Sequence, residues 1–167
     1  MSLKEEILKE HSKAQAMKIV SWVGDIQNRF DELFELFVSD EKLVVQRSGW
    51  PLSYCNTSYP TLIKKHFGRL VANLEKPRLH NAVKRNTMRL LQEVPIPKKY
   101  QGAIMNTCFE YISSFEEPAA VKAFSLTVLQ NLSKEYPEIL PEIKLLIEER
   151  WDHETSAFKS RARKILK

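Results

Sequence analysis

Apolar residues recur in this chain at a spacing close to 38 residues. Val45, Val83 and Val121 lie 38 residues apart, and Phe158 follows 37 residues later. A repeat period of about 20 to 50 residues is typical of helical repeat proteins, in which each unit buries its apolar face only against its neighbours. The same register aligns small side chains where stacked helices would approach closely, namely Ala16, Gly49, Thr87, Ser125 and Ala162.

The segment Pro118–Arg150 indicates what one repeat contains. From Ala120 to Leu132, apolar residues follow the i, i+3, i+4, i+7 spacing of one helical face. The Tyr136-Pro137 step ends this helix, because the residue before a proline is driven out of the α region, whereas proline suits the first turn of a following helix. The apolar face of that second helix comprises Ile139, Leu140, Ile143, Leu146 and Ile147. The segment is therefore expected to form a helical hairpin.

The composition excludes most β-containing folds. The chain has only four glycines and no Asn-Gly or Asp-Gly pair that would indicate a β-hairpin. Its 167 residues, of which 43% are hydrophobic, are enough for one domain with a sizeable core. We expect an all-α fold, a right-handed α-solenoid of about four to five helical hairpins.

The expected layout is a single repeat domain over residues 1–167. Residues 1–11 are expected to form an N-terminal cap anchored by Ile7 and Leu8, and residues 155–166 a C-terminal half-repeat. The complete hairpins are expected at residues 12–38, 41–74, 79–113 and 118–150.

Local signals set the expected helix ends. Ser12 is a suitable N-cap for the first helix of the first hairpin, and Gly24 is placed to end it. Asp25 is expected to cap the helix that follows. Pro51 is expected to bend a helix after Gly49. The second helix of the second hairpin is expected to run from Pro60 to Leu74.

The sequence VKAFSLTVLQNLSKEYPEILPEIKLLIE, residues 121–148, resembles a repeat of the HEAT family. Its first helix has the family's order of valine, basic, small and leucine residues, and its second helix begins at a proline. The resemblance extends over residues 12–166. It implies a stack of helical hairpins of the HEAT or armadillo-like type, acting as a binding surface or scaffold without enzymatic activity.

No motif predicts catalysis, a metal site or a cofactor. The histidines His11, His66, His80 and His153 lack metal-ligand spacing with one another or with Cys55 and Cys108. Zinc-protease, phosphate-loop and nucleophile-elbow motifs are absent. Trp22, Trp50 and Trp151 are interpreted as packing residues. A site assembled from distant residues stays open as an alternative. Some DNA glycosylases have HEAT-like repeats, although no catalytic residue can be matched here.

Basic residues recur at the position after the aligned apolar residue. Lys84, Lys122 and Lys159 occupy it in successive units, with Arg85 and Arg163 nearby. Stacked units would place these side chains in one row. The row could bind the phosphates of a nucleic acid.

The row also has a purely structural interpretation. Its lysines could instead form ion pairs with acidic residues of neighbouring turns, such as Glu116 and Glu117 beside Lys122. The sequence does not decide between a phosphate-binding row and internal ion pairs.

The function predicted from the sequence is docking of a protein or peptide partner on the face made by the second helices. Arg29, Lys65 and Arg69 are the candidate contacts on that face. Nucleic-acid binding through the lysine row is the alternative, and the net charge of +5 is compatible with it. The charged N-terminus and the lack of an apolar run of about 18 residues predict a cytoplasmic protein without a membrane span. The oligomeric state stays open.

Overall fold

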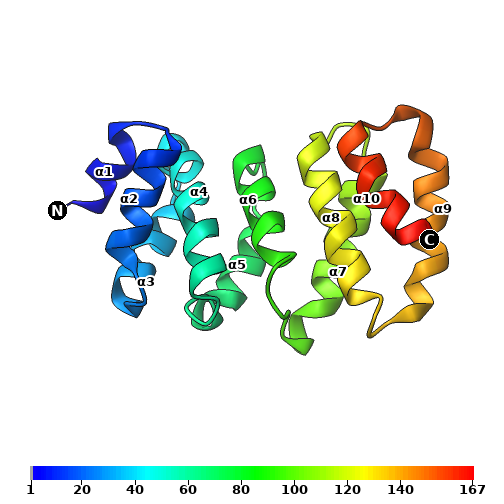
Figure 1. Ribbon diagram of the computed structural model, residues 1–167, viewed down its shortest axis with the longest axis horizontal. Helices are drawn as coiled ribbons and strands as arrows, with labels where there is room; N and C mark the ends of the chain where they lie inside the picture. The colour runs from blue at the N-terminus through cyan, green and yellow to red at the C-terminus, as the bar shows by residue number, and fades with distance from the viewer. Residues whose placement is uncertain (1) are drawn as a thin grey trace. The chain divides into compact units, whose positions relative to one another are not determined.

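The computed structural model describes residues 2–167, and the chain forms two compact units. The first unit ends at Glu93, and the second spans Val94–Lys167. Over residues 2–167 the secondary structure consists of helices, turns and bends, with no strand. The all-α prediction is therefore confirmed (Figure 1).

The first unit arranges its helices in two layers. In Figure 1, α2, α4 and α6 lie side by side, with α3 and α5 behind them, and α4 packs against α2, α3 and α6. The elements are α1 (Leu3–Lys9), α2 (Lys13–Val23), α3 (Gln27–Phe37), α4 (Lys42–Ser58), the 3-10 turn η1 (Lys64–His66), α5 (Phe67–Asn73) and α6 (Asn81–Leu91).

The second unit repeats the pairing of helices. Helix α8 packs against α7 on one side and α10 on the other, and α9 contacts α7 and α10. Its elements are α7 (Lys98–Ser113), α8 (Ala119–Leu132), the 3-10 turn η2 (Pro137–Ile139), α9 (Leu140–Arg150), the 3-10 turn η3 (Trp151–His153) and α10 (Ser156–Leu166). The two helices expected in the segment Pro118–Arg150 are α8 and α9. Helix α8 ends at Leu132, four residues before the expected Tyr136-Pro137 step, and Pro137 begins the turn η2 that precedes α9.

The ends of α2 follow the predicted caps, whereas the start of α3 does not. The hydroxyl of Ser12 accepts a hydrogen bond from the Gln15 amide, and Gly24 ends α2 with a positive φ of 52°. The prediction that Asp25 caps α3 is wrong. Ile26 is the N-cap residue, and no side chain bonds to the first turn.

Two further expectations need correction. The helix expected from Pro60 is a turn followed by η1 and α5, because the amides of Leu62, Lys64 and His66 each donate to the carbonyl three residues earlier. In α1 the buried anchors are Leu3 and Ile7, which share a face at i and i+4, whereas Leu8 is 36% exposed.

The residues that the repeat register aligns are buried, as that register predicts. Val45, Val83, Val121 and Phe158 all lie in the core. The aligned small residues are buried as well: Ala16, Gly49, Thr87, Ser125 and Ala162. The division into hairpins stays a prediction, because the expected pair at residues 79–113 comprises α6 of the first unit and α7 of the second.

Candidate binding surfaces

Two of the three basic residues predicted on the second-helix face, Lys65 and Arg69, belong to an ion-pair ladder between α3 and η1–α5. Lys65 Nζ lies 2.6 Å from one carboxylate oxygen of Asp31, and His66 Nε2 lies 2.6 Å from the other. Burial would by itself raise the pKa of Asp31, but hydrogen bonds from Lys65, Gln27 and His66 lower it to about 2. Asp31 is therefore a carboxylate at neutral pH.

The remaining members of that predicted surface are also engaged. The Arg69 guanidinium pairs with the Glu35 carboxylate, with Nη2 3.0 Å from Oε2. Arg29 donates a hydrogen bond to the Trp22 carbonyl at 2.6 Å and stacks on the Trp22 ring. Arg69 and Lys65 keep more than half of their side-chain surface exposed, so each pair stabilises the fold only slightly.

Lys122 is the most enclosed residue of the predicted lysine row. The residue is 4% exposed, and its Nζ lies 2.9 Å from Glu154 Oε1. Arg150 donates to the same oxygen from Nη2 at 2.7 Å and from Nε at 3.0 Å. The Glu154 side chain is only 3% exposed. Lys122 thus forms an internal ion pair, and its acceptor is Glu154 rather than Glu116 or Glu117.

The other members of the row are more open. Lys159 and Arg163, one turn apart on α10, each lie 5.5 Å from the centroid of the Trp151 indole. Lys84 and Arg85 on α6 are half-buried. Within the second unit, Lys159 and Arg163 therefore both contact the Trp151 ring, whereas Lys122 is buried in the core.

Arg85 lines a groove of about 580 Å³ between α4 and α6. Helix α4 contributes a continuous stripe at the i, i+4, i+7, i+8, i+11 spacing of one helical face. The stripe comprises Gln46, Trp50, Ser53, Tyr54 and Thr57. Across from it are Arg85, Asn86, Arg89 and Glu93, and His11 closes one side.

Aromatic rings form one wall of this α4–α6 groove. The His11 and Trp50 ring centroids are 5.5 Å apart, and those of Trp50 and Tyr54 are 6.3 Å apart with planes inclined by 30°. Next to Trp50 on α4 and Arg85 on α6, the two helices approach each other closely: a Cβ on Gly49 would lie 2.7 Å from Asn86 Cγ. The missing side chain at Gly49 therefore lets Trp50 and Arg85 line the same groove.

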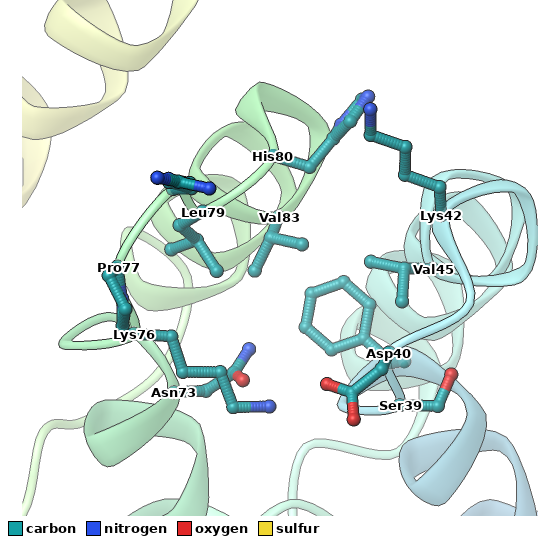
Figure 2. Close-up of a pocket in the computed structure, with 12 residues that line it drawn as sticks. Ser39, Asp40, Lys42, Val45, Asn73, Lys76, Pro77, Leu79, His80 and Val83 are labelled. Carbon is teal, nitrogen blue, oxygen red and sulfur yellow. The ribbon is translucent and has the colours of Figure 1, made fainter.

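A smaller pocket of about 230 Å³ lies at the loop end of the first unit, where α4 and α6 begin. Figure 2 shows Val45 and Val83 on its walls and the Lys42 and His80 side chains reaching toward each other at one end. His80 Nδ1 accepts the Ala82 amide at 3.0 Å, so this imidazole also caps α6.

The second unit has a groove of about 470 Å³ between α7 and the η2–α9 segment. Its apolar lining is Met105, Phe109 and Ile139, all half-buried. The carboxylates of Glu110 and Glu142, both on exposed residues, line it as well. This α7–α9 groove therefore combines apolar surface with negative charge.

Neither groove was found by sequence reasoning. Trp50 was interpreted as a packing residue, although Gln46, Trp50 and Tyr54 fall on one helical stripe. In α7, the buried face contains Ile104 and Cys108. The neighbouring residues Met105 and Phe109 form a second apolar stripe, which was the available signal of an additional apolar surface.

The described residues provide no metal centre. Across residues 2–167, no three His, Cys, Asp or Glu side chains gather in an arrangement that could bind a metal ion. No described helix is long and apolar enough to cross a membrane. Burial raises the pKa of the Cys55 and Cys108 thiols to about 12, so neither is an activated nucleophile.

Paired helices packed in two layers, with a repeated register of small buried residues, define the class of helical repeat proteins with an α-solenoid fold. The family described as HEAT repeat domain matches residues 3–167, and the chain belongs to that family. No curated protein and no solved structure shows significant similarity to the chain. HEAT repeats are commonly protein-interaction scaffolds and are generally not catalytic.

Proposed function

We propose that this protein is a non-enzymatic docking module that binds a basic, amphipathic segment of a partner protein in the α7–α9 groove. The observation that carries the proposal is the combination in one groove of Met105, Phe109 and Ile139 with the carboxylates of Glu110 and Glu142. The apolar residues would contact the apolar face of the segment, and the glutamates its lysines or arginines.

The surface next to the groove supports this docking mode. Leu145, three residues after Glu142 on α9, is 55% exposed and extends the apolar surface along the helix. The flanking residues Glu138 and Glu149 are also exposed. Half-buried aromatic and methionine side chains are enriched at interface cores. The net charge of +5 shows that this acidic surface is a local feature, which favours a basic partner over an acidic one.

The second-helix face of the first unit is a weaker candidate for docking. Lys65 and Arg69 would have to leave Asp31 and Glu35 to contact a partner. Docking there would exchange one exposed ion pair for another, with little gain in affinity. We therefore place the protein-binding surface on α7 and α9.

Binding of a basic amphipathic peptide tests this proposal. A fluorescently labelled helical peptide of leucine and lysine is expected to bind the wild-type protein, and Glu142→Lys is expected to weaken the complex about tenfold, as for a charge reversal at a steered interface. Glu148→Lys is the matched control, because it makes the same charge change at an exposed position of α9 that does not line the groove.

Equal loss of affinity in both variants would show that net charge alone attracts the peptide. No binding to the wild-type protein at low salt would contradict the proposal. Phe109→Ser provides a second variant, which removes apolar contact without changing charge.

A further inference from the structure

The α4–α6 groove of the first unit has a different chemistry, and we propose that it binds single-stranded nucleic acid. The site is independent of the α7–α9 groove. The bases of the nucleic acid would stack on Trp50 and Tyr54, which His11 flanks, and its phosphates would contact Arg85. Sequence-tolerant binding of single strands combines these two features, aromatic faces and positive charge along one groove.

The aromatic wall has the geometry that stacking requires. Trp50 and Tyr54 are half-buried, so their rings are held by α4 while part of each ring lines the open groove. They are one turn apart, and their planes are inclined by 30°. The His11 ring lies 5.5 Å from the Trp50 ring and is tilted by 58° to it, so it flanks this pair of rings. Successive rings along one helix can accept successive bases.

The polar groups opposite the rings suit the backbone and the base edges. Within residues 2–167, the side chains of Arg85 and Gln46 make no hydrogen bond or ion pair, although both line the groove. Asn86 donates its Nδ2 hydrogen to the Ala82 carbonyl at 2.8 Å, which fixes its orientation beside Arg85. A guanidinium can bind a phosphate through two parallel hydrogen bonds.

The charge balance of the groove is positive. Arg85 and Arg89 line it together with a single acidic residue, Glu93, which accepts a hydrogen bond from the Thr57 hydroxyl at 2.7 Å. An acidic peptide would satisfy the arginines but would leave the aromatic wall without a flat partner. The row of rings therefore favours nucleic acid over an acidic peptide.

The test is the fluorescence anisotropy of a labelled oligothymidylate of about 12 nucleotides, a length within the usual site sizes for single strands. We expect binding that weakens steeply as salt rises. Base stacking is also expected to quench the fluorescence of Trp50. Arg85→Glu and Tyr54→Ala are each expected to weaken binding about tenfold. Trp50→Leu is expected to abolish the quenching.

The matched control is Lys64→Glu, which makes the same change in charge as Arg85→Glu at an exposed residue of η1 that does not line the groove. This variant should bind the oligonucleotide with an affinity within about twofold of the wild-type value, a smaller change than the loss of one phosphate contact causes. The inference is overturned if the oligonucleotide does not bind at low salt or if Lys64→Glu weakens it as much as Arg85→Glu. It is also overturned if a polyglutamate peptide binds more tightly than the oligonucleotide. Circular dichroism confirms that each variant is folded.

Discussion

Replacing Gly49 by alanine is expected to destabilise the first unit, although alanine is the better helix former. The added Cβ would lie 2.7 Å from Asn86 Cγ and 3.0 Å from Asn86 Cβ, closer than atoms in a packed core can approach. Asn86 is 4% exposed and is held by its hydrogen bond to the Ala82 carbonyl. Either α4 and α6 must separate, or this amide must lose its partner.

The expected magnitude follows from three terms. Overpacking of a core costs about 1–3 kcal/mol. Loss of the Asn86 hydrogen bond costs about 1 kcal/mol. The higher helix propensity of alanine offsets about 1 kcal/mol of this. Gly49→Ala is therefore expected to lower the free energy of unfolding by about 2 kcal/mol, or the melting temperature by about 4–8 °C for a chain of this size.

Urea denaturation followed by circular dichroism measures the effect, and Gly102 provides the control. Gly102 lies within α7 with nothing within 4 Å of an added Cβ, so Gly102→Ala is expected to stabilise the protein by about 0.5–1 kcal/mol. In an Asn86→Ala background, which makes room for the added Cβ, Gly49→Ala should lower the free energy of unfolding much less than it does in the wild-type protein. If Gly49→Ala stabilises the protein as much as Gly102→Ala does, the close approach of α4 and α6 does not constrain Gly49.

Three further predictions follow from buried or paired groups. Lys122→Met is expected to destabilise the fold by about 3 kcal/mol in urea denaturation, because Glu154 loses one of its two buried cationic partners; a change below about 0.5 kcal/mol would contradict this. The pKa of Asp31 is depressed to about 2, so its stabilising contribution is fully present above about pH 4 and is lost as the pH falls toward 2. The free energy of unfolding of Asp31→Asn should therefore fall less over this pH range than that of the wild-type protein. Acid titration of the circular dichroism signal measures the difference. Cys55 and Cys108 are buried with raised pKa values, so a thiol-reactive chromophore should label neither in the native protein and both in denaturant; rapid native labelling would be inconsistent with their burial.

The sequence predicted the elements that depend on local signals and on apolar periodicity. Helix α7 (Lys98–Ser113) ends where the hairpin expected at residues 79–113 ends, because its apolar spacing is regular up to that point. Gly24 ends α2 because an L side chain rarely adopts its positive φ. The aligned residues from Val45 to Phe158 are buried because a regular apolar spacing along a helix marks the face that packs into the core.

The partners of charged side chains could not be predicted in this way. Lys122 was considered with Glu116 and Glu117, which are close in sequence, but its acceptor is Glu154, 32 residues away. Tertiary packing decides such pairs, because the turn η3 brings Glu154 against α8. Lys65 and Arg69 likewise find their carboxylates on α3, 34 residues earlier.

The two grooves were missed because each requires two helices to be placed side by side. Trp50 alone resembles any half-buried tryptophan, and only the approach of α4 to α6 at Gly49 puts it in one groove with Arg85. Met105 and Phe109 widen the apolar face of α7 beyond the buried stripe. Sequence periodicity could have suggested that second stripe, but not the glutamates beside it.

NMR mapping with ¹⁵N-labelled protein and the basic amphipathic peptide shows directly whether α7 and α9 form the docking surface. Docking in the α7–α9 groove should give the largest chemical-shift changes at the amides of Met105, Phe109 and Glu142, with little change along α3 and α5. Shifts concentrated at Lys65 and Arg69, with α7 and α9 unaffected, would contradict it.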